Sequence, residues 1–404
     1  LVIEVPMKAS YARYARGRRQ LPPGKFVTAS LYPDTFASAR DVDIGDHGTW
    51  LYSPSWKWQD TMFNELFVGG DIRGLAFLTE SDQYIRGPAY ADFTRTEDTV
   101  VLRISLISTP TLLSKPLHYE YGYIATPVKP RPKDPIIHQP SYFATDKYPE
   151  FIQRSCVAVN YHILANINTP RYRHPQGGKA LVKRIGNYGV PVVADTYMSA
   201  ASTTTPEYAL FSPEWDVLPR DGWVVPTGRV RYACQSTSHA QFYLDSARRM
   251  VEEMGLGGVY IDVSGPMANR NPYSGCGYID DEGERRPTVP LWASRKVFQR
   301  LYTYLHTDGR NGIIYSHTTH DTCIGGYVDV VTEGENWGTE GKRQYTRLSP
   351  DMFRAGFMKT QLGTPFTFYI FHQYSWRGNS YGTPVSLDEV LMISLVHGVL
   401  VSIG

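Results

Sequence analysis

The pattern of apolar and polar positions changes character near residue 125 of the chain. Before that point, short runs alternate apolar with polar residues or carry β-branched ones, and Gly, Pro and Asp interrupt them, as in KFVTASLY, LFVGGDIRGLAFL and DTVVLRISLIS. Short strands separated by frequent turn residues are typical of an antiparallel sheet protein. Residues 1–125 are therefore predicted to form an N-terminal antiparallel β-sandwich.

A proline-rich segment follows this region. The stretch TPVKPRPKDPIIHQP, residues 126–140, holds five prolines and shows neither helical nor strand periodicity. Proline fixes the backbone in extended conformations and makes linkers stiff. The segment is predicted to be a linker between two domains.

From residue 141 to 404, strand-like runs alternate with helical ones. The strand-like runs are CVAVNYHIL, VPVVADTY, a run near WVVPTGRVRYACQ, GGVYIDVS, NGIIYSHTT, YVDVVTEGE and TPFTFYIFHQY. One intervening helix is expected to begin after Ser238 and end at Gly255. Such alternation predicts a parallel sheet, and this many units favour a TIM-type (β/α)8 barrel. LVSIG follows the last helical run, so the chain is expected to stop short of the eighth unit.

Composition excludes some functions. The 41 Lys and Arg and 39 Asp and Glu leave a net charge of +2, without the basic excess of a nucleic-acid binder. No apolar run approaches the ~20 residues that span a membrane. The 29 Tyr and 8 Trp suit contacts with sugar rings, although they equally suit the packing of a large β-rich protein.

The four cysteines, Cys156, Cys234, Cys276 and Cys323, form no C-x-x-C pair and match no zinc or thioredoxin-like spacing. Disulfides and buried thiols both stay open. No metal and no other cofactor is predicted. The chain begins without methionine, so both ends read as trimmed. We expect a secreted, periplasmic or cell-surface protein whose signal peptide is not in this chain. Nothing in the pattern favours an oligomeric state.

Carboxylates stand where strand-like runs end. Asp262 closes GGVYIDVS, the expected fourth strand, and Glu333 and Glu335 close YVDVVTEGENW, the expected sixth. Barrel enzymes place their chemistry at the carboxyl ends of strands, and paired carboxylates act as acid and as base or nucleophile on a glycosidic bond. An apolar ring such as Trp337 would raise the pKa of a neighbouring acid. The predicted catalytic residues are Asp262 with Glu333 or Glu335, the choice between the two staying open.

Other polar and aromatic residues are predicted to bind substrate because they lie at strand ends or in the loop after Asp262. They are Asp195, Tyr197, Asn271, Tyr278, Asp281, Glu282, His317, His320, Trp337, His372 and Tyr374. Acidic residues beside Gly283 also suit an ordinary solvated turn. The H-x-x-H formed by the two histidines of the fifth strand lacks the H-E-x-x-H frame of zinc enzymes, which favours sugar or structural hydrogen bonds.

The segments TMFNELFVGGDIRGLAFLTESDQYI, YEYGYIATPVKPRP and GGVYIDVS with the later GCGYIDDEG resemble the glycoside hydrolase family 123-like proteins over about residues 58–397. The resemblance implies a β-sandwich joined to a TIM-type barrel. It also implies an adjacent Asp-Glu pair that works with the N-acetyl group of the substrate. Here the adjacent pair upstream of the fifth strand is Asp281-Glu282, in a loop, and Asp388-Glu389 lies on an expected helix. Hydrolysis of a glycoside is therefore favoured over any particular sugar.

The sequence thus predicts a glycoside hydrolase that acts on a complex polysaccharide or glycan through a carboxylate pair. One alternative is a non-catalytic carbohydrate-binding or structural surface protein that retains the fold, since function belongs to sites rather than folds. A weaker alternative is a polysaccharide lyase with His317 or Tyr374 as the base.

Overall fold

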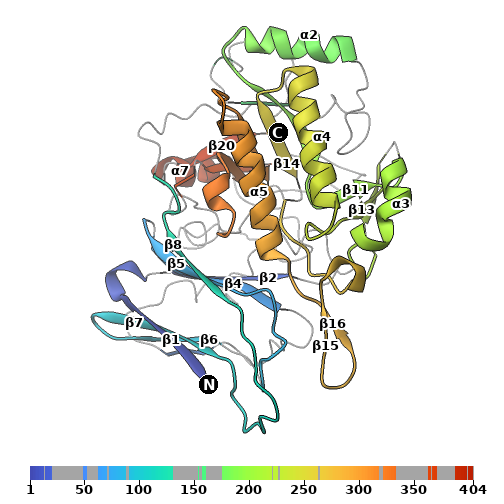
Figure 1. Ribbon diagram of the computed structural model, residues 1–404. Coiled ribbons are helices and arrows are strands. Elements are labelled where there is room, and N and C mark those ends of the chain that lie inside the picture. The colour runs from blue at the N-terminus through green and yellow to red at the C-terminus, as the bar shows by residue number, and fades with distance from the viewer. Residues whose placement is uncertain are drawn as a thin grey trace.

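The computed structural model describes most of both predicted regions. The described residues are 1–12, 14–20, 49–51, 62–70, 72–87, 91–130, 153, 157–160, 175–220, 222–225, 228–262, 264–317, 322–333, 363–364, 366–370, 387–397 and 399–403. Figure 1 shows the antiparallel strands, in blue, at one end of the molecule and the helices α2, α4 and α5 toward the other.

Two four-stranded antiparallel sheets form the N-terminal region. The first has the order β1-β7-β6-β3, with β1 Val2–Lys8, β7 Thr99–Ser105, β6 Ala91–Arg95 and β3 Thr49–Leu51. The second has the order β2-β4-β5-β8, with β2 Tyr14–Gln20, β4 Met62–Gly69, β5 Gly74–Leu78 and β8 Gly122–Thr126. The 3-10 turn η1, Ala9–Tyr11, follows β1. Apolar residues of both sheets share one buried core, including Leu102, Leu66 and Phe77. The antiparallel pairing is as predicted, and the two sheets partly support the predicted sandwich.

The second sheet is buried on both faces. Phe77 lies in the sandwich core, and its neighbour Leu78 belongs to the core of the C-terminal region. Successive strand residues point to opposite faces, so a strand covered on both sides needs an unbroken apolar run. The run GLAFL of β5 has that pattern, and it joins the sandwich to the rest of the molecule.

A seven-stranded parallel sheet forms the C-terminal region, in the order β20-β19-β18-β17-β14-β10-β9. Its strands are β9 Ala158–Asn160, β10 Val192–Tyr197, β14 Gly258–Asp262, β17 Ile313–His317, β18 Val330–Glu333, β19 Phe366–Ile370 and β20 Leu400–Ile403. Neighbours in the sheet are neighbours in sequence, without a reversal of order. Because crossovers between parallel strands are right-handed, an order without reversal places every crossover on the same face. This is the winding of a (β/α) barrel and differs from a doubly wound sheet.

Helices cover the outer face of this sheet. They are α2 Pro175–Gly186, α4 His239–Met254, α5 Leu291–His306 and α7 Leu387–Val396, with the 3-10 turn η3 at Gly325–Tyr327. As predicted, α4 begins after Ser238 and ends at Gly255, whose φ of 73° lies in the left-handed region that glycine adopts readily. Figure 1 shows α4 and α5 running side by side over β14.

One predicted strand is wrong. The run near WVVPTGRVRYACQ is not part of the parallel sheet. It forms β12 Gly222–Val225 and β13 Gly228–Tyr232, which pair antiparallel with each other, and β13 also pairs antiparallel with β11 Ala200–Ser202. The turn residues Pro226 and Gly228 interrupt the run, and such residues favour a hairpin over one long strand. The helix α3, Pro206–Trp215, lies in the same inserted segment of the chain, between β10 and α4.

This correction renumbers the strand ends. Among the described parallel strands Asp262 closes the third, not the fourth, and Glu333 closes the fifth, not the sixth. The segment LVSI, expected to follow the last helix as a trimmed end, is the strand β20 and pairs parallel with β19. The described residues form seven parallel strands, as many as were expected, but β20 stands in place of one expected strand.

The two faces of the parallel sheet have separate cores. Val259 and Ile261 of β14 pack with helix residues such as Phe298. Tyr260, between them, packs on the opposite face with Val193 and Tyr315. The inner face of the sheet is thus packed with aromatic and aliphatic side chains. Two residues further along each strand, the side chain points to this same face, at the carboxyl edge of the sheet.

The sandwich and the parallel sheet are joined by buried polar contacts. Glu65 of β4 is 1% exposed and accepts hydrogen bonds from the backbone N–H and the hydroxyl of Thr322, the first described residue after β17. The Glu80 carboxylate accepts from the N–H of Trp292 in α5 at 2.7 Å. The sandwich therefore helps to fix the chain that follows β17.

Of the predicted linker, residues 126–130 are described and 131–140 lie outside the described residues. In the described part of the chain, no helix combines the length and apolar character needed to cross a membrane.

Candidate functional site

Asp262 and His317 meet at the carboxyl edge of the parallel sheet. Each is the last residue of its strand, and β14 pairs with β17 in parallel. The Oδ1 atom of Asp262 lies 3.2 Å from Nδ1 of His317. The aspartate side chain is 26% exposed and the histidine side chain 1%, so the buried imidazole holds one side of a carboxylate that solvent and a ligand can reach.

Aromatic rings support this pair from below. Tyr260 and Tyr315 are fully buried, and their rings meet edge to face with centroids 5.0 Å apart. The ring of His317 lies 5.8 Å from that of Tyr260. Aromatic packing of this kind restricts the rotation of the imidazole, so His317 presents Nδ1 to Asp262 from a fixed position.

Two serines tie the strand ends together. Ser264, two residues beyond Asp262, donates from its hydroxyl to the carbonyl oxygen of His317 at 2.9 Å. The hydroxyl of Ser316 lies 3.0 Å from that of Ser264. These buried bonds fix the backbone of β14 against that of β17, just where the aspartate and the histidine meet. Positioning of this kind is what a catalytic group needs.

Asp195 and Tyr197 lie on the neighbouring strand β10. Tyr197 pairs in register with Asp262, and Asp195 pairs with Tyr260. Residues two apart in a strand share a face, and both side chains are half-buried. Thr196, between them, points to the helices, where it donates to the carbonyl of Tyr260 and contacts the hydroxyl of Tyr243 at 2.9 Å. The structure therefore brings Asp195, Tyr197, Asp262 and His317 to one edge of the sheet.

Glu333 ends β18, the strand beside β17, and the residue before it pairs with His317. The described structure gives its backbone and not its side chain. Five other predicted site residues lie outside the described residues: His320, Glu335, Trp337, His372 and Tyr374. The backbones of β14 and β18 flank one strand, so they are about 10 Å apart, twice the usual strand spacing.

The loop after Asp262 carries the remaining predicted residues away from the strand end. The side chain of Asn271 is buried, donates to the carbonyls of Pro213 and Asp216 at 2.8 Å each, and accepts from the N–H of Tyr273. Because these backbone groups use both ends of the amide, its visible role is to hold the loop, including the 3-10 turn η2 at Pro272–Ser274.

Tyr278, Asp281 and Glu282 belong to or adjoin a small hairpin of β15 Tyr278–Ile279 and β16 Arg285–Arg286. Tyr278 donates to Asp82 of the sandwich at 2.8 Å. Asp281 forms an exposed ion pair with Arg86 at 3.2 Å, and Glu282 is exposed. Tyr278 and Asp281 therefore contact the sandwich, and not the strand end that carries Asp262.

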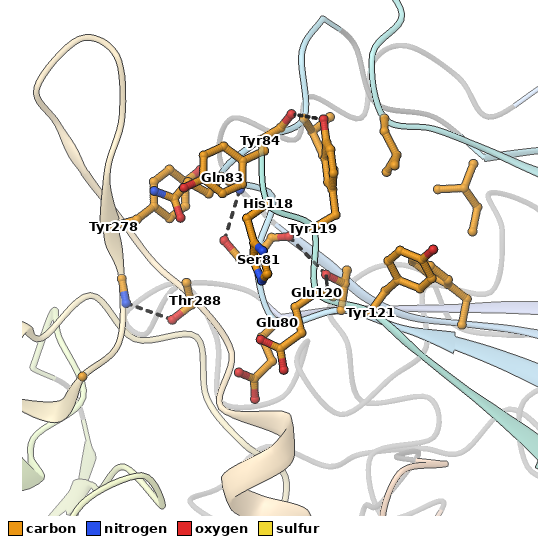
Figure 2. A pocket seen from close by; sticks show the side chains of 17 residues that line it. Glu80, Ser81, Gln83, Tyr84, His118, Tyr119, Glu120, Tyr121, Tyr278 and Thr288 are labelled. Atoms are coloured by element: carbon orange, nitrogen blue, oxygen red, sulfur yellow. Dashed lines mark hydrogen bonds between the residues drawn. The ribbon is translucent and has the colours of Figure 1, made fainter. Parts of the chain in front are cut away.

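A pocket that sequence reasoning missed lies beside this hairpin, between the barrel loop and the sandwich. We call it the junction pocket, and its polar and aromatic lining includes Glu80, Ser81, Gln83, Tyr84, His118, Tyr119, Glu120, Tyr121, Tyr278 and Thr288. Figure 2 shows the carboxylates of Glu80 and Glu120 ending close together, with tyrosines from both regions around them. Its parts come from four separate stretches of chain, none at the end of a parallel strand, so no local pattern marks it.

The electrostatics of the junction pocket differ from those of the sheet edge. Burial raises the pKa of Glu80 to about 7, and the nearby charge of Glu120 adds to the rise, while the hydrogen bond from Trp292 opposes it. Burial likewise raises the pKa of Asp82, against the hydrogen bond from Tyr278. Among the described residues no cluster of His, Cys, Asp and Glu has the arrangement of a metal site.

No protein-family model matches the sequence, and no curated protein matches it significantly. Among solved structures, the chain is similar to TtGalA, an alpha-galactosidase from Thermus thermophilus, at 11% identity and a TM-score of 0.49, covering 99% of this chain and 84% of that one. It is also similar to the glycoside hydrolase domain of PelA from Pseudomonas aeruginosa, at 11% identity and a TM-score of 0.41, covering 65% and 92%. It is similar, too, to the maltogenic alpha-amylase AmyB from Thermotoga neapolitana, at 16% identity and a TM-score of 0.41, covering 64% of this chain and 61% of that one. Likeness of this extent establishes no shared activity.

Proposed function

We propose that this protein is a glycoside hydrolase acting on a complex polysaccharide or glycan. The observation that carries the proposal is the Asp262 carboxylate, accessible at the carboxyl edge of a singly wound parallel sheet and held 3.2 Å from a buried imidazole. Chemistry in barrel enzymes takes place at this edge. We further propose that the parallel sheet is part of a closed (β/α)8 barrel, and that the protein is exported.

In this proposal, Asp262 acts as the nucleophile or as the general base. A carboxylate in either role must be ionised when the substrate arrives. His317, when protonated, would stabilise that charge through Nδ1, and Tyr260 and Ser264 keep the imidazole and its backbone in place. The Asp262 side chain is 26% exposed, so the anomeric carbon or the attacking water can approach it.

The acid that protonates the leaving group would be Glu333 or Glu335. A backbone spacing of about 10 Å between β14 and β18 suits both the ~5 Å carboxyl separation of retaining enzymes and the ~6.5–9.5 Å of inverting ones, since side chains can converge or diverge. Asp195 and Tyr197, on the other side of Asp262, would bind sugar hydroxyls. Ancestry in family 123 stays a prediction, and so does the identity of the sugar.

The proposal is tested by turnover of a glycan panel, read as the mass of released products. Asp262→Asn should lower turnover by about 10³-fold or more, because it removes the charge without changing the shape. Glu333→Gln and Glu335→Gln identify the acid, since only one should have a comparable effect. Matched controls are Asp308→Asn and Glu97→Gln, both exposed and remote from the sheet edge. Full activity of Asp262→Asn, or of both Gln variants, would refute the assignment.

A further inference from the structure

The junction pocket is a concave site whose lining includes neither Asp262 nor His317. It encloses a cavity of about 290 Å³, near the lower end of the ~300–1,000 Å³ usual for ligand pockets. A monosaccharide unit fits this volume. One wall belongs to the sandwich and includes Thr79, Ile104 and Tyr121, while the other belongs to the barrel loop and includes Tyr278 and Thr288.

Hydrogen bonds hold the walls in position without a ligand. Tyr278 reaches across from the barrel loop to Asp82. Tyr119 donates from its hydroxyl to the carbonyl of Tyr84 at 2.7 Å, and Thr79 donates to the carbonyl of Glu120 at 3.0 Å. A site that is already ordered loses little conformational entropy when it binds. The pocket therefore has the rigidity of a preformed site.

The carboxylates in the pocket point to the kind of ligand. Glu80 and Glu120 repel each other, and no Lys or Arg of the described residues forms an ion pair with either. The nearby arginines are used elsewhere, since Arg86 pairs with Asp281 and Arg286 with Asp280. Two carboxylates that form no ion pair with a described Lys or Arg suit a ligand rich in hydroxyl or ammonium groups, which donate hydrogen bonds. They disfavour uronates and sulfated sugars, whose negative charge would be buried beside theirs.

Aromatic faces supply the other half of a sugar site. Tyr121 is 44% exposed, and its ring is held by contacts with Phe77 at 5.6 Å and Tyr123 at 5.8 Å. Figure 2 shows Tyr121 on one side of the two carboxylates and Tyr84 and Tyr278 on the other. Apolar ring faces together with carboxylate acceptors match the two surfaces of a pyranose, its C–H face and its hydroxyl edge.

We propose that the junction pocket binds a neutral or amino-sugar residue of a glycan, with Glu80 and Glu120 accepting its hydrogen bonds and Tyr121 packing on its ring. The choice of a sugar rests on the proposed function; the donor-rich chemistry of the ligand rests on the pocket itself. The loop that carries Tyr278 begins just beyond Asp262, so the same segment contributes to both sites. The pocket would hold a part of the glycan that is not being cleaved.

Binding is measured by titration calorimetry on the full chain with Asp262→Asn, so that no ligand is consumed. The probes are neutral galacto-oligosaccharides and chito-oligosaccharides, chitosan oligomers for amino sugars, and oligogalacturonates for acidic ones. A neutral or amino probe should bind, and Glu120→Gln and Tyr121→Ala should each weaken that binding about ten-fold. The controls Glu97→Gln and Tyr273→Ala, an exposed carboxylate and an exposed ring outside the pocket, should leave it unchanged.

Three results would overturn the inference. One is the absence of saturable binding by every neutral and amino probe, and another is tighter binding of the oligogalacturonate. The third is binding that survives Glu120→Gln and Tyr121→Ala but is lost with His317→Asn, which would place the ligand at the sheet edge. None of these refutes the proposed function, which is judged by turnover in the wild-type chain. Conversely, a wild-type chain that turns over no glycan but binds a probe in the junction pocket would refute the proposed function and leave the inference about the pocket standing.

Discussion

Two half-buried carboxylates of this molecule have opposite surroundings. Asp262, at the edge of the parallel sheet, has a buried imidazole 3.2 Å away. Glu80, in the junction pocket, faces the charge of Glu120 instead, and its pKa is raised to about 7, chiefly by burial. Burial beside a like charge favours the protonated form of a carboxyl group such as Glu80.

In our two proposals, Asp262 belongs to a reactive site and Glu80 to a binding site. A carboxyl group that takes up a proton easily is a poor nucleophile but a good partner for sugar hydroxyls, because it can accept and donate hydrogen bonds. The predictions below change the partner of each carboxylate in turn.

The largest effect is expected from the partner of Asp262. His317→Ala removes the imidazole and should lower kcat by about 10²-fold, the usual size of a charge-stabilising contribution. His317→Asn keeps a donor at a similar position and should recover part of that loss. The decisive measurement is kcat of the two variants beside the wild type, with His317→Asn expected between His317→Ala and the wild type.

A matched control exists in the same chain. His306 contacts Asp329 at 3.2 Å, the same separation as in the Asp262–His317 pair. His306→Ala should leave kcat as it is in the wild type. If His306→Ala and His317→Ala lower kcat equally, the His317 imidazole supports the fold and not the carboxylate of Asp262.

A third carboxylate, Glu65, connects the two regions and has a purely structural environment. It is 1% exposed, and its oxygens accept from the backbone N–H and the hydroxyl of Thr322. Glu65→Ala leaves these donors buried without their acceptor, so the free energy of unfolding should fall by about 2–4 kcal/mol. Urea unfolding measures this change.

Glu4→Ala is the comparison for that variant. Glu4 pairs with Arg103 at 2.8 Å, but both side chains are about half exposed. An exposed ion pair contributes about 0–1 kcal/mol, so unfolding should barely change. A loss of stability in Glu65→Ala no larger than in Glu4→Ala would show that Glu65 does not join the sandwich to the parallel sheet.

The sequence predicted the sheet edge well because periodicity and strand-end chemistry are local. GGVYIDVS identifies β14 and its terminal Asp262, and NGIIYSHTT identifies β17 and His317. That the two residues meet follows from adjacent parallel strands ending at one edge. The pairing of Nδ1 with Oδ1 depends on side-chain rotamers, which no periodicity encodes.

Two features could not be predicted from local pattern. The run from Gly222 to Tyr232 has the apolar content of a parallel strand, yet its pairing with β11 depends on a tertiary excursion. The junction pocket joins Glu80, Glu120 and Tyr278, which are brought together by the packing of one region on the other. In the sequence, Glu80 is an acidic residue that follows a strand, and Glu120 is an acidic residue between two tyrosines, so neither is marked as part of a pocket. Their mutual repulsion exists only in the folded chain.

The smallest expected effect is that of Glu80→Gln, and it depends on pH. The folded chain raises the pKa of Glu80 from 4.5 to about 7, so between these values the folded state holds a proton that the unfolded state has released. By linkage, this group lowers stability progressively as pH rises from about 4.5 to about 7, and by a constant amount above that. Glutamine keeps an acceptor for the N–H of Trp292 and carries no charge. Glu80→Gln should therefore match the wild type near pH 4 and be more stable by about 1–2 kcal/mol at pH 8, once solvent screening is allowed for. Thermal unfolding at both pH values, with Glu97→Gln as the control, measures the difference. A stability gap that stays constant with pH would mean that Glu80 ionises normally, and the contrast between the two carboxylates would disappear.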